Sequence, residues 1–205
     1  MFKLLGRSTS GNVQKVMWLL DEIGAEYVRE DYGREFGNTD GAYLALNPTG
    51  KVPTLVDGDV VVWESNTILR YVCEATNSTY LPAAAAERSA MGTWMDFQLA
   101  SLNEPYLAVF RETRKPEEER GPELIDMAEA LAGQLGIPNE KLEGRDWLVA
   151  DALSLAEFSL APIIHRCLNF PIELPELGNL RAWHNRLLTR ENFANVVSPP
   201  KSAAA

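Results

Sequence analysis

The segment Asn47-Pro48-Thr49-Gly50-Lys51-Val52-Pro53-Thr54-Leu55 decides the fold of this chain of 205 residues. Its Asn-Pro and Thr-Gly pairs are typical of turns, and the β-prone residues after Pro53 predict a short strand. Asp57-Gly58 then favours a two-residue hairpin into a second strand over Val60–Trp63. Ser65 follows at the expected N-cap of a helix, before apolar residues at helical spacing. The order predicted here is turn, strand, hairpin, strand and helix.

Val52 is the residue of this segment that is best placed to bind a ligand. It precedes a proline, which biases its backbone toward the extended region. An extended residue can pair its N–H and C=O with a peptide that lies antiparallel to it. Further along the chain, Glu64 and the N–H groups at the helix start behind Ser65 suit an ammonium and a carboxylate. Together these features predict a receptor for a short zwitterionic peptide.

These residues also carry a family resemblance. Asn47-Pro48-x-Gly50-Lys51-Val52-Pro53, followed by Glu64-Ser65-x-x-Ile68, resembles the glutathione-binding core of the cytosolic glutathione transferases. The resemblance extends over nearly the whole chain. It implies a cis bond before Pro53, pairing of Val52 with the cysteinyl backbone of glutathione, and a Glu64-Ser65 site for the γ-glutamyl end. Lys51 is expected to contact glutathione as well, and a homodimer is implied.

The first part of the chain has the pattern of an α/β domain. Phe2–Leu5 predicts a strand, an apolar stripe from Val13 to Ile23 predicts a helix that ends at Gly24, and Glu26–Tyr32 predicts a second strand. With a weak helical turn over 42–46 and the hairpin and helix above, the order is β-α-β-(α)-β-β-α. That order is typical of a thioredoxin-like domain with a mixed sheet.

The remainder has almost no strand signal. Apolar spacing predicts a long helix over Glu87–Arg111, kinked near Pro105, and a second helix that ends at Gly136. Ser154-Leu155-Ala156-Glu157 is a capping box that starts a third helix, and apolar residues over Leu177–Leu187 mark a last one. These helices predict an all-α helical-bundle domain. The resemblance to the glutathione transferases also implies that the C-terminal half is all-helical.

The domain boundaries follow from these patterns. We expect a thioredoxin-like, glutathione-binding domain over residues 1–76 and a linker over 77–86. An all-helical domain is expected over 87–200 and a frayed tail over 201–205.

The chemistry is expected in the turn before the first helix. Residues 1–24 contain no Cys, His or Tyr, which excludes a Cys-x-x-Cys redox pair and a tyrosine-type transferase. Ser8, Thr9, Ser10 and Asn12 remain, and a hydroxyl there can donate a hydrogen bond to a thiolate, aided by the helix dipole. Ser10 is the predicted catalytic residue, because its spacing to Lys15 matches the serine-type transferases. Thr9 and Asn12 are the alternative catalytic residues. In the structural alternative, Ser10 is simply the N-cap of the helix.

Residues of the helical half complete the list of candidates. Asn103, Tyr106 and Phe110 are predicted to line an electrophile pocket, because that face of the long helix should look toward the first turn. Core packing is the competing interpretation for the two aromatic residues. His165 and His184 are expected to be core or surface histidines without a catalytic role.

Composition excludes several classes of protein. A formal charge of −10 and a pI near 4.8 argue against a nucleic-acid footprint, which needs a basic face. No run approaches the length of a membrane span, and the N-terminus lacks a signal-peptide core. Two cysteines, far apart in the sequence, form no metal or redox spacing, so we expect a cytoplasmic protein without a metal.

The expected activity is glutathione transfer in detoxification. Glutathione is the co-substrate, and its thiolate attacks a small hydrophobic electrophile. One alternative is a glutathione-dependent peroxidase or disulfide reductase, favoured if Asn12 rather than Ser10 faces the sulfur. The other is a non-catalytic transferase-like binding or scaffold protein.

Overall fold

The computed structural model describes residues 1–38 and 40–198, so the predicted tail over 201–205 lies outside the described residues. The chain divides into two compact units. Unit 1 comprises Met1–Leu81 and the chain from Thr189 onward, and unit 2 comprises Pro82–Leu188. Unit 1 is a thioredoxin-like α/β domain and unit 2 is all-helical, so the predicted fold class is confirmed.

Unit 1 is built on a mixed sheet with the order β2-β1-β3-β4. Its strands are β1 (Phe2–Leu5), β2 (Tyr27–Glu30), β3 (Thr54–Asp57) and β4 (Val60–Trp63). β1 runs parallel to β2 and antiparallel to β3, and β3 and β4 form the predicted hairpin. Leu4 pairs with Leu55 at the centre of the sheet, and both side chains are fully buried.

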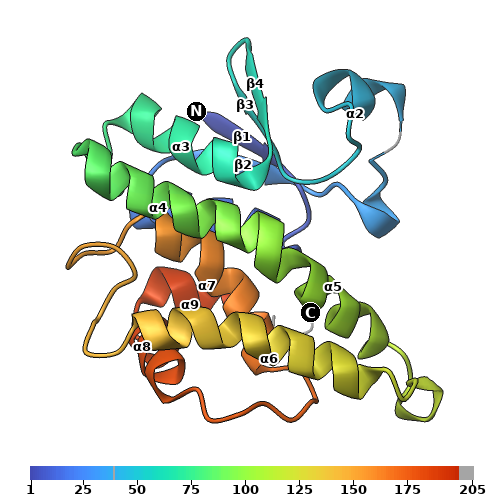
Figure 1. The fold of residues 1–205 in the computed structure, drawn as a ribbon. Helices are drawn as coiled ribbons and strands as arrows, with labels where there is room; N and C mark the ends of the chain where they lie inside the picture. The colour runs from blue at the N-terminus through green and yellow to red at the C-terminus, as the bar shows by residue number, and fades with distance from the viewer. Residues whose placement is uncertain (39, 199–205) are drawn as a thin grey trace. The chain divides into compact units, whose positions relative to one another are not determined.

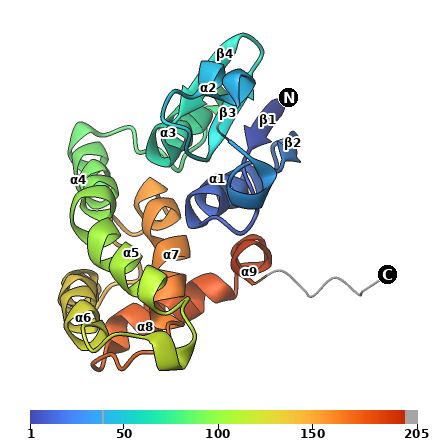
Figure 2. The same ribbon diagram turned by 90° about the vertical axis from the view of Figure 1, so that its right-hand side faces the viewer.

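Within residues 1–38 and 40–198, four α-helices accompany this sheet. They are α1 (Gly11–Glu22), α2 (Gly41–Leu46), α3 (Ser65–Thr76) and α9 (Glu191–Val197), and a short 3-10 turn, η1 (Arg34–Phe36), precedes α2. α1 and α3 pack side by side, and α3 also contacts β3 and β4 (Figures 1 and 2). Both helices begin near the segment around Pro53, so their N-termini are available to a site there.

The start of α3 differs from the prediction. Ser65 was expected to be the N-cap, whereas Glu64 occupies that position and Ser65 is the first helical residue. The Glu64 backbone has φ 70° and ψ 116°, a conformation that non-glycine residues rarely adopt. The preceding strand β4 runs directly into the helix, and this sharp corner displaces the cap by one residue.

Helix α9 is an addition to the predicted elements, and it belongs to unit 1. It packs on α1, where the Trp18 and Phe193 ring centroids lie 4.6 Å apart and Gln14 Nε2 donates to the carbonyl of Val196 at 3.0 Å. Arg190 forms an ion pair with Glu22. The sequence pattern assigned these residues to the helical domain, whereas the structure clusters them with unit 1.

Unit 2 is a bundle of helices. Its elements are α4 (Ala85–Phe97), the π-helical η2 (Gln98–Leu102), α5 (Asn103–Glu112), η3 (Glu117–Glu119), α6 (Leu124–Lys141), α7 (Leu155–Leu168) and α8 (Gly178–Leu188). α4, η2 and α5 follow one another as a single long bent helix, with α6 packed along α5 and α7 along α4 (Figure 1). The core is apolar and includes Met91, Met95, Leu131, Leu135, Phe158, Ile164 and Trp183.

Two helices of unit 2 depart from their predicted courses. The expected kink near Pro105 is a π-helical turn that immediately precedes α5, consistent with a proline that cannot donate to the carbonyl four residues earlier. The second predicted helix does not end at Gly136 but continues to Lys141. Pro138 is buried in its last turns and extends the apolar stripe of Leu131 and Leu135.

The capping box of α7 is confirmed. The Ser154 side chain accepts from the Ala156 N–H, and Glu157 accepts from both the N–H and the hydroxyl of Ser154 at 2.9 Å. A further N–H, that of Leu148, donates to Glu157 at 2.7 Å. Burial raises the pKa of Glu157 to about 7, against the opposing effect of these donors.

Candidate active site

Six of the residues predicted for the site line one shallow hollow of unit 1. The hollow has a volume of about 30 Å³. The predicted residues along it are Asn12, Lys51, Val52, Pro53, Glu64 and Ser65, and Asn47 and Thr49 join them. A ligand at this place therefore lies along the surface of unit 1.

A buried hydrogen-bond network supports one wall of the hollow. The Tyr43 hydroxyl donates to the carbonyl of Lys51 at 2.6 Å and lies 2.9 Å from the Thr54 hydroxyl. Asn47 Nδ2 donates to the same two oxygens, at 2.8 and 3.0 Å. Tyr43, Asn47 and Thr54 are each at most 1% exposed, so their polar atoms depend on these bonds. The network fixes the backbone on both sides of Val52.

Val52 presents its backbone as predicted, and the Val52–Pro53 bond is cis. A β-carbon at Gly6 would lie 3.3 Å from that of Val52, and one at Gly33 would lie 3.4 Å from its methyl groups. The Val52 side chain is thus packed against the backbone of neighbouring segments. Among the described residues, no hydrogen bond takes up the N–H or the C=O of Val52. Both groups are open to a peptide-like ligand.

The N-termini of α1 and α3 meet at the other wall. Ser65 is buried at 3% exposure, and its hydroxyl donates a long bond of 3.4 Å to Asn12 Oδ1. Glu64 is exposed and holds the strained backbone described above. Strain of this kind is concentrated at functional sites. Two helix N-termini and one carboxylate can accommodate an anion and a cation, respectively.

Ser10 occupies the N-cap position of α1, yet its hydroxyl makes no capping bond. Its backbone is extended at φ −86° and ψ 125°, and the residue is 9% exposed. Thr9 is exposed, and neither Thr9 nor Ser10 lines the hollow, whereas Asn12 does. The hydroxyl of Ser10 therefore lies at a helix N-terminus without serving as its cap.

Lys15 is a charged residue of α1 that the sequence analysis did not assign to the site. Its side chain is fully buried, and burial lowers its pKa to about 7, an effect that the nearby Glu64 carboxylate opposes. The sequence does not indicate that this lysine is buried. Its one distinctive feature is that it directly precedes the apolar Val16.

The three residues predicted for an electrophile pocket lie on α5 in unit 2. Tyr106 is buried, and its ring is stacked with those of Phe110 and Phe170, with both centroid separations at 5.9 Å. The guanidinium of Arg114 lies 5.7 Å from the centre of the Phe110 ring. Phe170 joins this cluster from the end of α7, a contact that spacing along one helix could not indicate.

His165 and His184 form a pair in unit 2, although they are far apart in the sequence. Nδ1 of His165 lies 3.0 Å from Nε2 of His184. In residues 1–38 and 40–198, no group of three or more His, Cys, Asp or Glu side chains is arranged to hold a metal ion. His184 is buried and His165 is half-buried at the contact of α7 with α8, and the sequence did not indicate that the two residues pair.

Comparisons with known proteins agree with this fold. Residues 2–74 match the family model for the glutathione S-transferase N-terminal domain, and residues 102–191 match the model for the C-terminal domain. Glutathione S-transferase GstB of Escherichia coli strain K12 is 33% identical over 211 aligned positions, covering 98% of this chain and all of that protein. Glutathione S-transferase 4 of Zea mays is 30% identical, covering 92% of this chain and 88% of its own.

A solved structure is similar over almost the full length. The theta class glutathione S-transferase from Xanthomonas axonopodis pv. citri, with glutathione bound, has a TM-score of 0.91 and 34% identity, and covers 96% of this chain and 97% of its own. The present chain belongs to the glutathione S-transferase family, and it is a transferase enzyme. Within the described residues, no helix combines the length and apolar character that crossing a bilayer demands.

Proposed function

We propose that this transferase takes glutathione as its co-substrate, ionises the glutathione thiol and directs the thiolate at a small hydrophobic electrophile. The observation that supports this most strongly is the hollow at Val52, with an unpaired backbone N–H and C=O on one wall and two helix N-termini on the other. The cysteinyl backbone of glutathione pairs with Val52. Glu64 and Ser65 hold the γ-glutamyl ammonium and carboxylate, and Lys51 contacts the bound peptide.

Ser10 stabilises the thiolate in this proposal. Its hydroxyl is not used for capping, so it can donate a charge-assisted hydrogen bond to sulfur at the positive end of α1. Lowering a thiol pKa by two units corresponds to about 2.7 kcal/mol in favour of the thiolate. One such bond with a helix terminus supplies a stabilisation of that size. Asn12, whose Oδ1 accepts a bond from Ser65, and Thr9 are the alternatives for this role.

The electrophile binds at Asn103, Tyr106 and Phe110, and the aromatic cluster that Phe170 completes favours a substrate with an aromatic ring. The protein acts as a cytoplasmic homodimer in detoxification. Exposed apolar side chains in unit 1, including Val60, Val61 and Trp63 of β4, support a second copy as partner.

One observation favours a second activity. Asn12 lines the hollow and Ser10 does not, and a glutathione-dependent peroxidase or disulfide reductase is favoured if Asn12 rather than Ser10 faces the sulfur. Turnover of an organic hydroperoxide and of a mixed glutathione disulfide, measured beside turnover of a halogenated nitroaromatic, distinguishes the two activities. The transferase proposal expects the nitroaromatic to give the largest kcat/KM.

Binding of glutathione itself tests the proposal as a whole. We expect isothermal titration calorimetry to show one glutathione per chain, and Glu64→Gln to weaken the affinity because the ammonium loses its ionic partner. A matched control is Glu74→Gln, an exposed residue of the same helix that does not line the hollow. Absence of glutathione binding, with the fold intact by circular dichroism, would support the scaffold alternative instead.

A further inference from the structure

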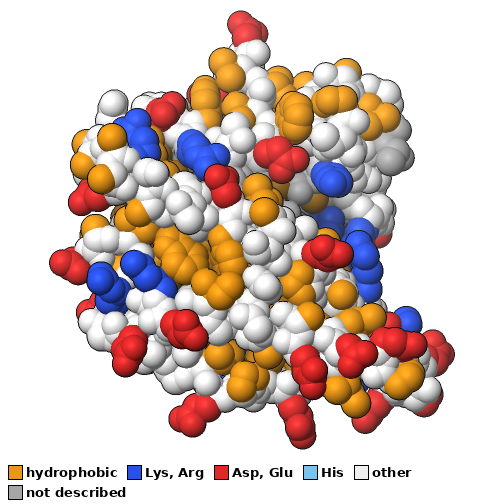
Figure 3. Space-filling model, viewed as in Figure 1, with side chains coloured by type: hydrophobic (Ala, Val, Ile, Leu, Met, Phe, Trp, Pro, Cys, Tyr) orange, Lys and Arg blue, Asp and Glu red, His pale blue; other side chains and the backbone are white. Residues whose placement is uncertain are grey.

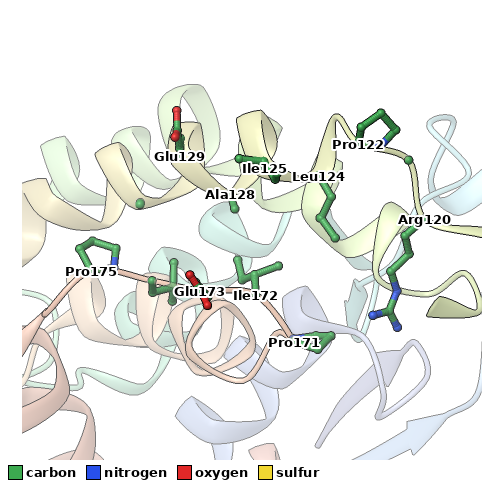
Figure 4. Close-up of a pocket in the computed structure, with 13 residues that line it drawn as sticks. Arg120, Pro122, Leu124, Ile125, Ala128, Glu129, Pro171, Ile172, Glu173 and Pro175 are labelled. Carbon is green, nitrogen blue, oxygen red and sulfur yellow. The ribbon is translucent and has the colours of Figure 1, made fainter. Parts of the chain in front are cut away.

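The hollow at Val52 is too small to enclose a tripeptide. Its volume is about 30 Å³, so both ends of a bound glutathione lie along the surface beside it. A far larger hollow of about 990 Å³ lies in unit 2, between α6 and Pro171–Pro175 (Figure 4), but none of its lining residues lines the hollow at Val52. Groups beside the Val52 hollow must therefore hold the two ends of the peptide.

The direction of the peptide follows from the proposed pairing. Glutathione that lies antiparallel to the chain at Val52 has its γ-glutamyl end toward Pro53 and its glycyl end toward Lys51. The γ-glutamyl end then reaches Glu64 and Ser65, as proposed above. The glycyl end carries a carboxylate, which binds best to a positively charged donor on the Lys51 side.

The loop after β2 brings Arg7 to the glycyl side of Val52. Within this loop, Asn38 Nδ2 donates to the carbonyl of Gly50, two positions before Val52. A β-carbon at Gly33, in the same loop, would lie 2.6 Å from Nη1 of Arg7 and 3.4 Å from the methyl groups of Val52. The Arg7 guanidinium therefore packs on the backbone of Gly33, next to the Val52 side chain.

The surrounding structure holds Arg7 in place. Gly33 has φ 93°, a conformation that favours glycine, and its missing side chain leaves the space that the guanidinium occupies. Nε of Arg7 is buried, although the residue as a whole is only half-buried. Its backbone N–H donates to the carbonyl of Tyr32 at 3.0 Å, and its carbonyl accepts the N–H of Ser10 at 3.1 Å. Arg7 is thus positioned before a ligand arrives.

The charge of the protein makes a local cation important at the glycyl end. The chain has a formal charge of −10, and Figure 3 shows acidic side chains spread over the visible face. Glutathione is itself an anion at neutral pH, so this field repels it. The carboxylate of Asp31, close to Gly33 in the sequence, is already paired with Arg29. A guanidinium has five N–H donors, so Arg7 can keep its bonds within the protein and still bind a carboxylate.

From this arrangement we infer that Arg7 binds the glycyl carboxylate of glutathione and so makes the site specific for a peptide with a free C-terminal carboxylate. Its planar fork can donate to both carboxylate oxygens, whereas the ammonium of the exposed Lys51 is a point charge on a flexible stem. The inference rests on the proposed binding of glutathione at Val52.

The test compares glutathione with its glycyl ethyl ester, which lacks the negative charge at that end. Isothermal titration calorimetry should show that the wild type binds glutathione roughly five- to tenfold more tightly than the ester, since the bond is charge-assisted but partly solvated. Arg7→Gln should remove most of this preference, because it weakens glutathione and leaves the ester nearly unchanged. Arg70→Gln, on α3 and outside the hollow, is the matched control and should keep the full preference.

Arg7→Lys keeps the charge without the fork. It should lose part of the preference, and it decides the question if Arg7→Gln does not fold. Circular dichroism and thermal melting establish which variants are folded.

Kinetics distinguish binding of the carboxylate from an effect on the sulfur. In Arg7→Gln, KM for glutathione should rise with little change in kcat, and the pKa of the bound thiol should stay near that of the wild type. A full preference for glutathione over the ester in the Arg7 variants, or a raised thiol pKa in its place, overturns the inference and leaves the proposed function intact. If the folded wild type binds neither peptide, the proposed function fails and the inference fails with it.

Discussion

At the scale of single residues, the hydroxyl of Tyr43 and the amide of Asn47 shape the site although neither was predicted to bind the ligand. Both donate to the carbonyl of Lys51, and both reach the hydroxyl of Thr54. They fix the backbone beside Val52 before a ligand arrives. Preorganisation of this kind lowers the cost of ordering the site on binding.

Tyr43→Phe tests this role. It removes the bonds to Lys51 and Thr54, so the free energy of unfolding should fall by about 1–2 kcal/mol. KM for glutathione should rise with little change in kcat, because the Val52 backbone binds glutathione equally in the ground and transition states. Tyr71→Phe is the control, since the Tyr71 hydroxyl donates to Asp57 at 3.0 Å in the same unit but does not line the hollow. Equal KM values for both variants would show that the network is purely structural.

The residues that line the hollow could be predicted from the sequence, but the residues that hold them in place could not. Val52, Pro53, Glu64 and Ser65 stand in a motif whose turn and helix-start chemistry can be read from the sequence. Asn47 gives a partial signal, because an asparagine before a turn often bonds to backbone nearby. Tyr43 and Lys15 give none, because both are buried although local spacing does not place either on an apolar face.

At the scale of elements, the start of α7 depends on one buried carboxylate. Glu157 accepts the N–H groups of Leu148 and Ser154 and so joins the preceding loop to the helix. The capping box was evident from the sequence, but the bond to Leu148 was not, because it joins residues in two different segments.

Truncation of the two partners should therefore have unequal effects. Ser154→Ala removes one cap and should lower the free energy of unfolding by about 1 kcal/mol. Glu157→Ala leaves two buried N–H groups without an acceptor and should cost about 3 kcal/mol. Glu191→Ala, in the exposed first turn of α9, should stay within about 0.5 kcal/mol of wild type. Chemical denaturation measures all three, and equal losses for Ser154→Ala and Glu157→Ala would contradict the bridging role.

Element types were predicted better than element ends. The hairpin of β3 and β4 and the helices α1, α3 and α7 follow from local periodicity and turn residues. Gly136 did not end α6, because Pro138 continues the buried stripe and packing compensates for its missing donor. Helix α9 has only two buried apolar residues, Phe193 and Val196, which is too few for a periodic signal.

At the scale of the whole molecule, we expect the His165–His184 pair to contribute to the loss of stability in acid. Burial, followed by the charges of His165 and Arg181, lowers the pKa of His184 to about 4 from 6.5. Burial and Arg166 likewise lower the pKa of His165. Between pH 6.5 and 4 the unfolded chain binds a proton at position 184 that the native chain does not. Stability contributed by this residue is therefore lost as the pH falls through that window.

His184→Gln isolates this contribution. The amide can still bond to His165 but does not titrate, so the free energy of unfolding should fall less steeply between pH 6.5 and 5 than in the wild type. Glu157, whose pKa is raised, acts in the opposite direction in part of this window and is common to both proteins. Denaturation curves across the range give the two slopes. If the free energy of unfolding has the same pH slope in the wild type and in His184→Gln, residue 184 binds protons equally in the folded and unfolded states, and the prediction is wrong.

The proposed homodimer is a second prediction at this scale. Light scattering at micromolar concentration should give twice the mass of 22.8 kDa. Trp63→Glu, which places a charge on the exposed face of β4, should shift the protein toward the monomer. A monomeric wild type would contradict the proposal.

The fold class of both units could be predicted, because alternating strands and helices give way to helices alone after the hairpin. The placement of α9 could not. It depends on the contact of Phe193 with Trp18, residues that lie far apart in the sequence. The cluster of Phe170 with Tyr106 and Phe110 was missed for the same reason.

The most direct test of the central claim is the pH titration of glutathione thiolate absorbance on the wild-type enzyme, Ser10→Ala and Ser65→Ala. Loss of the Ser10 hydroxyl should raise the pKa of the bound thiol by about one to two units and lower kcat, while glutathione affinity stays nearly intact. Ser65→Ala should leave the thiol pKa unchanged and raise KM for glutathione, because it removes a contact made equally in the ground and transition states. An unchanged thiolate titration in Ser10→Ala would contradict the account, and the catalytic role would pass to Asn12 or Thr9.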